Sequence, residues 1–169
     1  MRGQLGIKIQ KLNIVTIRTE SNMEPQAKTE TNVQQAVPFF NVKNIEKSIR
    51  FYIDGLGFEM TNRWIDEGKL RWCWLKHGGA ALMLQDYRTE GRDFWTPEGK
   101  VGVGVSIYFI CKDALAIYRE VMARGIQATR PFVGNSMWVT SMTDPNGYKI
   151  FFESYTDAAE ETIYSDNPG

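Results

Sequence analysis

The sequence predicts an α+β fold in which two βαβββ modules form a curved mixed sheet around a cleft. Two observations carry this prediction. A pattern of strand, short helix and further strands occurs twice, over about residues 36–87 and about 101–155, and a polar capping residue follows the first strand of each copy. Helix-then-strands repeated twice is more typical of two paired mixed sheets than of a doubly wound parallel sheet.

In the first module, the β-rich run 36–42 predicts a strand, and Asn44 is a suitable N-cap for the helix that follows. The apolar residues of this helix recur at helical spacing and are Ile45, Ile49, Tyr52 and Ile53. Gly55 and Gly57 end the helix, because glycine adopts positive φ at little cost. Strands are expected over 58–64, 70–75 and 80–85, with a tight turn at 77–79.

In the second module, a strand within 101–111 precedes Asp113, the predicted cap of a helix that ends at Gly125. Its inward residues are Leu115, Tyr118, Val121 and Met122. Strands are expected over 126–131, 138–142 and 148–155, and the last two flank an Asp-Pro-Asn-Gly turn at 144–147. The two copies align with Asn44 on Asp113, 77–79 on 145–147, and 82–84 on 150–152.

The composition bounds the class of protein. The chain has 169 residues, 43% of them hydrophobic, so one domain of about residues 35–157 with a sizeable core is expected. Twenty basic and twenty acidic residues cancel, which argues against a nucleic-acid binder. No apolar run approaches the length of a membrane span. Cys73 and Cys111 lie in apolar runs without metal-binding spacing, which favours buried reduced thiols and a cytoplasmic location.

The segments that flank this domain differ from it in composition. Residues 1–34 are polar apart from a few isoleucines and predict a flexible N-terminal extension, although its basic, acid-free first part also resembles an organelle presequence. Residues 158–169 are expected to form a C-terminal tail.

The motifs of both modules resemble those of the vicinal oxygen chelate superfamily, which contains glyoxalases, bleomycin resistance proteins and extradiol dioxygenases. The resemblance covers about residues 36–155 and is carried by Phe51-Tyr52, Leu56-Gly57-Phe58, Ile107-Tyr108-Phe109, Asp144-Pro145-Asn146-Gly147 and Phe151-Phe152-Glu153. It implies the fold described above and, by analogy with the family, a homodimer. It does not imply one reaction, because a single fold supports many functions.

Enzymes of this superfamily place metal ligands on the cleft-facing strands of both modules. The matching positions here are Val37, Met83, Ser106 and Phe151, none of which is a good ligand for a divalent metal. A shift of two residues brings in Gln85 and Glu153 and still supplies no histidine. His77, the single histidine, lies at a Gly-Gly turn, where it is an exposed turn residue or a general base that reaches the cleft. No cofactor is therefore expected.

Aromatic side chains describe the predicted cleft better than metal ligands do. The candidate ligand-binding residues are Phe39, Trp72, Met83, Gln85, Tyr108, Trp138, Phe151 and Glu153. Such walls bind flat, apolar or cationic molecules through stacking and cation–π contacts. Glu153 is the single candidate catalytic residue, as a carboxylate that could exchange a proton with a ligand. The facing of Trp72 and Trp74 stays open at this point.

Three functions remain open. The first is a protein of the bleomycin-resistance type that binds a small aromatic or amphipathic molecule without a catalytic metal, as in antibiotic resistance by sequestration. The alternative is a metal-dependent lyase, isomerase or dioxygenase of the same superfamily. The third is an interaction module without a small ligand. Metal-stimulated turnover would separate the second from the others.

Overall fold

The computed structural model describes residues 32–87 and 97–166, and the compact unit begins at Ala36. The elements of the first module are β1 (Phe39–Val42), α1 (Ile45–Ile49), π-helical turns over Arg50–Gly55, β2 (Glu59–Asp66), β3 (Lys69–His77) and β4 (Ala80–Asp86). Those of the second are β5 (Ser106–Ile110), α2 (Ala114–Ala123), β6 (Phe132–Gly134), β7 (Met137–Thr143) and β8 (Lys149–Tyr155). The predicted α+β class with two βαβββ modules is confirmed.

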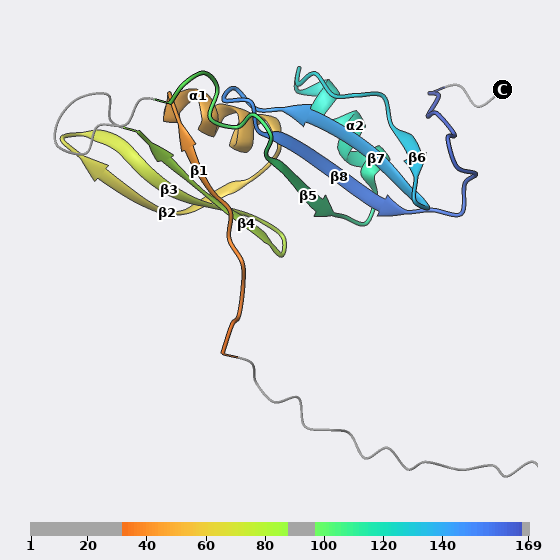
Figure 1. Cartoon of the computed structure of the whole chain (residues 1–169), viewed down its shortest axis with the longest axis horizontal. Coiled ribbons are helices and arrows are strands. Elements are labelled where there is room, and N and C mark those ends of the chain that lie inside the picture. Colours follow the sequence, from red (N-terminus) through yellow and green to blue (C-terminus); the bar gives the residue numbers. More distant parts are fainter. Residues whose placement is uncertain (1–31, 88–96, 167–169) are drawn as a thin grey trace, which may run out of the picture. The chain divides into compact units, whose positions relative to one another are not determined.

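Each module forms a four-stranded mixed sheet with the same topology. The strand orders are β1-β4-β3-β2 and β5-β8-β7-β6 (Figure 1). The first strand of each module pairs in parallel with the last strand, and the other pairs are antiparallel. The two sheets stay separate and do not close into a barrel.

The two helices begin as their caps predict. Asn44 Oδ1 accepts a hydrogen bond from the Lys47 N–H at 2.8 Å, and Asp113 Oδ1 accepts one from the Ala116 N–H at 2.9 Å. Both cap residues have extended backbones with nearly equal torsion angles. The structure thus repeats the same strand-to-helix junction in both modules.

The strand predicted over 126–131 is wrong, because the short strand β6 begins only at Phe132. Before it, the Thr129 N–H donates to the Ser141 carbonyl at 2.8 Å, and Thr140 Oγ1 donates to the Thr129 carbonyl at 2.8 Å. Pro131 has no N–H to donate, so regular pairing with β7 starts after it. The segment therefore runs beside β7 without a continuous ladder.

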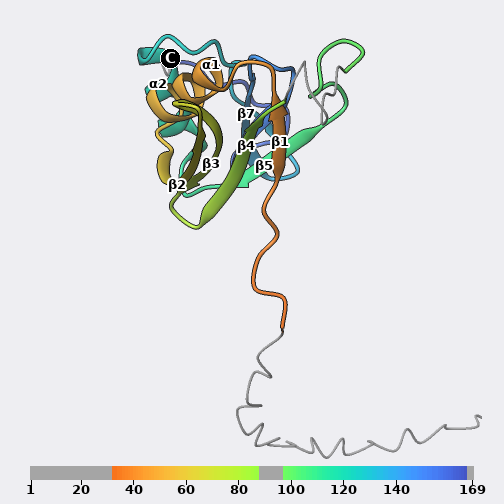
Figure 2. The same cartoon turned by 90° about the vertical axis from the view of Figure 1, so that its left-hand side faces the viewer.

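One hydrophobic core joins the two modules on the helix-covered side of the sheets. It includes Tyr52, Phe58 and Leu84 of the first module with Ile150 and Phe152 of the second, all nearly inaccessible to solvent. Figures 1 and 2 both show α1 and α2 on one side of the strands. Alternate side chains of each strand point into this core, so on each sheet the remaining side chains form the face that is turned away from the core. We call these two faces, one on each sheet, the open faces.

The flanking segments are described only in part. The predicted N-terminal extension over 1–34 lies outside the described residues except for its last three positions. Residues 161–164 run along β6, where the Val133 N–H donates to the Thr162 carbonyl at 2.9 Å. Within the described residues, no helix is long and apolar enough to cross a membrane.

Candidate open-face binding site

The open face of the first sheet is aromatic near its centre. In the strand register, Phe39 lies opposite Met83, Trp74 also lies opposite Met83, and Trp72 lies opposite Gln85. Directly opposed residues share a face, and Leu84, between Met83 and Gln85, is buried in the core. Phe39, Trp72, Met83 and Gln85 are therefore brought together on the open face, and both Trp72 and Trp74 point to that face.

The open face of the second sheet carries a second aromatic cluster. The rings of Tyr108 and Phe151 stack with their centroids 4.5 Å apart and their planes 11° from parallel. Glu153 lies two residues further along β8, so it shares this face. Ile150, Phe152 and Ser154 alternate with these residues and are buried.

Trp138 is placed apart from the other predicted residues. It lies opposite Ser154 in the register of β7 and β8, which puts it on the helix-covered face. There its ring makes an edge contact with Tyr164, at a centroid distance of 6.3 Å. The strand register therefore does not bring Trp138 together with Phe151 and Glu153 on one surface.

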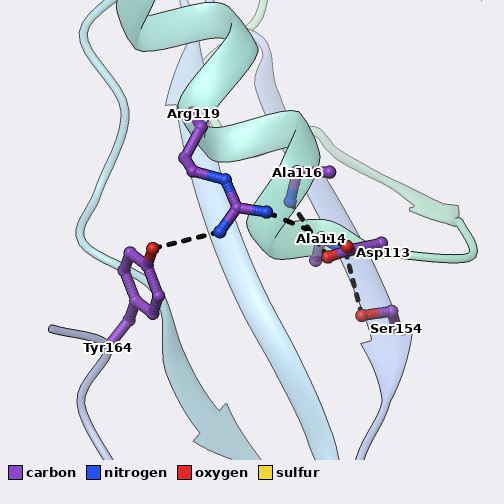
Figure 3. Close-up of polar contacts among 6 residues, drawn as sticks. All are labelled: Asp113, Ala114, Ala116, Arg119, Ser154 and Tyr164. Carbon is purple, nitrogen blue, oxygen red and sulfur yellow. Dashed lines mark hydrogen bonds and ion pairs between the residues drawn. The ribbon is translucent and has the colours of Figure 1, made fainter. Parts of the chain in front are cut away.

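The contacts around α2 explain why this face is covered. The Ala114 N–H donates to Ser154 Oγ at 3.0 Å, so a buried strand hydroxyl satisfies an N–H at the start of the helix (Figure 3). Arg119 Nη1 donates to the Tyr164 hydroxyl at 3.1 Å, and the Arg119 guanidinium lies 4.0 Å from Asp113. These contacts fix α2 and the segment around Tyr164 over the side of the sheet that carries Trp138.

The residues of the open faces do not fit a divalent metal. Gln85 and Glu153 supply one oxygen-donor side chain on each sheet, and two such side chains do not make up the ligand set of a divalent metal. Among residues 32–87 and 97–166, no three His, Cys, Asp or Glu side chains lie close enough to hold a metal ion. His77 ends β3 with its ring against Phe58, at a centroid distance of 5.3 Å. Phe58 belongs to the core, so His77 is not part of either aromatic cluster.

A buried polar network joins the two modules and so fixes the relation between their sheets. Asp144 Oδ1 accepts from the N–H groups of Asn146 and Tyr148 at 2.8 and 2.9 Å, and its Oδ2 accepts from the Tyr52 hydroxyl at 3.4 Å. Burial raises the pKa of Asp144, and these hydrogen bonds oppose that rise. Burial also raises the pKa of Tyr52, with the Asp144 carboxyl adding to the effect. With 2% exposure, Asp144 cannot reach a ligand and has a structural role.

Sequence reasoning missed two features of the first open face. Trp64 lies opposite Trp72, so it extends the aromatic cluster to the edge strand β2 and is 49% exposed. The indole Nε1 of Trp74 is buried and has no hydrogen-bond partner among the described residues. The spacing of Trp72 and Trp74, two residues apart in a strand, indicates a shared face, but no local pattern shows which face that is.

The fold agrees with the family to which the sequence belongs. A sequence model of the Glyoxalase/Bleomycin resistance protein/Dioxygenase superfamily matches residues 33–152, so the chain is a member of that superfamily. The resemblance found in the sequence motifs is thereby confirmed. No curated protein sequence matches the chain.

Several solved structures are similar to this one. A glyoxalase/bleomycin resistance protein/dioxygenase from Nocardioides is 17% identical over 80% of this chain and 93% of its own, with a TM-score of 0.56. TioX from Micromonospora sp. ML1 is 15% identical over 75% and 99%, with a TM-score of 0.55. TnmS3, an antibiotic binding protein from Streptomyces sp. CB03234, is 20% identical over 73% and 98%, with a TM-score of 0.53. At these identities the likeness shows the fold alone.

Proposed function

We propose that the chain binds a small aromatic or amphipathic molecule between aromatic open faces, without a catalytic metal. The observation that carries this proposal is the concentration of aromatic side chains on those faces, around Trp72 on one sheet and around Phe151 on the other. Aromatic rings bind a flat ligand by stacking. Gln85 and Glu153 would orient the ligand through hydrogen bonds. TnmS3, which has a similar fold, is described as an antibiotic binding protein, and this description supports a small-molecule ligand.

The buried Nε1–H of Trp74 supports a polar contact within this site. An indole N–H without an acceptor costs free energy when it is removed from water, by about 1–3 kcal/mol. A carbonyl or hydroxyl oxygen of the ligand would recover that cost once the indole turns to expose its Nε1–H, which is inaccessible in the unbound structure. The proposed ligand is therefore aromatic and carries at least one oxygen acceptor.

We further propose that the cleft forms between two copies of the chain, with the first sheet of one copy facing the second sheet of the other. The sheets of one chain do not close into a barrel, and Phe39 and Tyr108 are 45% and 53% exposed on their open faces. Clusters of exposed apolar residues are typical of interaction surfaces. A homodimer would cover these residues and complete both walls of the cleft.

Intrinsic fluorescence tests the binding proposal with a matched pair of tryptophans. We expect titration with planar, oxygen-bearing aromatic antibiotics to quench the wild-type protein, and Trp72→Phe to weaken the binding of any hit by about tenfold, or 1.4 kcal/mol. Trp138→Phe, on the helix-covered face, should bind as the wild type does. Equal losses in both variants, or no quenching by any compound of the panel, would contradict the proposal.

Elemental mass spectrometry of protein purified without chelators or affinity metals tests the metal-free part. We expect no divalent metal near one equivalent per chain, before or after loading with manganese, iron, nickel or zinc. A retained equivalent, together with turnover of a glutathione hemithioacetal or a catechol, would establish the enzyme alternative instead.

A further inference from the structure

A pocket of about 560 Å³ lies where the β3–β4 turn meets the end of β5 and the start of α2, and it shares one lining residue, Tyr108, with the aromatic cluster of the second open face. Its volume is within the range of about 300–1,000 Å³ that is usual for small-molecule sites. Phe109, Ile117 and Phe152 provide apolar lining, and Gly78 and Ala80 of the turn line it as well.

The equivalent junction, where the β7–β8 turn meets the end of β1 and the start of α1, is filled by side chains. There, Asn146 of the β7–β8 turn accepts a hydrogen bond from the Lys43 N–H at 2.9 Å and donates one to Ser48 Oγ at 3.0 Å. Tyr148 stacks on Phe40 at a centroid distance of 4.0 Å, and its hydroxyl donates to the Asn41 carbonyl at 3.1 Å. An amide and a phenol ring thus occupy this junction.

The internal repeat relates the strands and helix caps of the two junctions. The equivalent caps Asn44 and Asp113 and the equivalent strand pairs Phe40–Leu84 and Phe109–Phe152 fix the alignment. It places Ala80 at the position of Tyr148. The β3–β4 turn has two residues between His77 and Ala80, whereas the β7–β8 turn has three between Asp144 and Tyr148, so the shorter turn carries only Gly78 and Gly79 where the longer one carries Asn146. The groups that contact Asn146 and Tyr148 correspond to Lys112, Ile117, Phe109 and Ile110, and all four line the pocket. The pocket is therefore the space that an asparagine and a tyrosine fill at the equivalent junction.

The vacant junction keeps the polar groups that a ligand would need. No described residue accepts a hydrogen bond from the Lys112 N–H, whose counterpart at Lys43 binds Asn146. The Cys111 N–H donates to the Glu153 carbonyl of β8, and alternate residues of a parallel strand point the opposite way. The Ile110 carbonyl therefore faces away from β8, as the Asn41 carbonyl does where it accepts from Tyr148.

The charge of the lining favours an acid. Lys112 lines the pocket, and none of the described residues that line it is acidic. We propose that this pocket binds a small phenolic acid. Its ring stacks on Phe109 in the place of the Tyr148 ring, its carboxylate accepts from the Lys112 N–H, and its hydroxyl donates to the Ile110 carbonyl. Tyr108 lines both this pocket and the second open face, whereas Gly78, Ala80 and Lys112 belong to neither aromatic cluster. Substitutions at those three positions therefore test this pocket separately from the open faces.

Nuclear magnetic resonance of the labelled full chain, titrated with 4-hydroxyphenylacetate, tests the proposal. We expect saturable amide shifts at Gly78, Gly79 and Lys112. The double variant Gly78→Asn/Ala80→Tyr adds an amide and a phenol ring to this junction. A Cβ at Gly78 meets no atom within 4 Å, and asparagine is among the residues that adopt a positive φ such as the 56° of Gly78 most readily. The double variant should fold with the spectrum of the wild type elsewhere and bind at least about tenfold more weakly.

Lys112→Glu keeps the test decisive if the double variant does not fold, since Lys112 is exposed. We expect it to weaken binding of the probe severalfold, whereas Lys149→Glu on the open face should leave binding unchanged. The proposal is overturned if no saturable shifts occur, if they are confined to residues around Trp72 and Phe151, or if Lys112→Glu binds as tightly as the wild type. In each of these cases the proposal for the open faces is still tested by its own variants.

Discussion

Removal of the Asn146 side chain should loosen the junction between the modules. Its amide makes three hydrogen bonds: it accepts from the Lys43 N–H at 2.9 Å and donates to Ser48 Oγ at 3.0 Å and to the Asp144 carboxyl at 3.2 Å. Asn146 is 6% exposed, so water does not replace these partners freely. At about 1 kcal/mol for each neutral bond and about 1.5 kcal/mol for the bond to a carboxylate, Asn146→Ala should lower the free energy of unfolding by about 3.5 kcal/mol.

Urea unfolding followed by tryptophan fluorescence measures this loss. A change of about 3.5 kcal/mol is large against the roughly 5–15 kcal/mol that stabilise a typical domain, and it corresponds to a fall in melting temperature of about 7–14 °C. Asn62→Ala is the matched control, because its side chain is exposed and bonds only to the adjacent Arg63 N–H. A loss below about 1 kcal/mol for Asn146→Ala, or one equal to that of the control, would refute the reasoning.

Three further predictions follow from buried groups. Burial raises the pKa of Cys73 to about 11, so a thiol reagent at neutral pH should modify the less buried Cys111 first and Cys73 only on unfolding; equal rates in the native protein would contradict this. Ser154→Ala removes the acceptor at the start of α2. It should lower the free energy of unfolding in urea by about 1 kcal/mol, as Asp113→Ala should. An unchanged free energy of unfolding in either variant would be inconsistent with the capping. Because the folded-state pKa of Asp144 is raised, its contribution to stability is greatest below the unfolded-state pKa of about 3.9 and is lost as the pH rises through the folded value. The stability of the wild type relative to Asp144→Asn should therefore fall across that window, and a constant or rising difference would contradict the assigned cause.

Much of the fold could be predicted because its signals are local. Caps at Asn44 and Asp113 and the turn at 144–147 follow from side chains that bond to backbone groups a few residues away. The absence of a strand before Phe132 could not be predicted locally. It follows from Pro131, which lacks an N–H, and from the hydrogen bonds of Thr129 to β7, which are tertiary contacts.

The candidate site could be predicted only where alternation in a strand was enough. Phe151 and Glu153 are two residues apart and share a face, as the sequence indicates. The facing of Trp138 depends on its register with Ser154, a polar residue that turns inward because it caps α2. The bond from Lys43 to Asn146 spans 103 residues and leaves no local trace in the sequence.

The most direct test of the central proposal is a mixed dimer of two differently tagged chains, one with Trp72→Ala and the other with Phe151→Ala. Binding of 8-anilinonaphthalene-1-sulfonate is measured by fluorescence against both parent homodimers. A cleft shared between copies leaves one intact cleft in the mixed dimer, so we expect weak binding in each homodimer and half of the wild-type capacity in the mixed dimer. A mixed dimer that binds no better than its parents, or chains that do not form a dimer, would contradict a cleft built from the open faces of two copies.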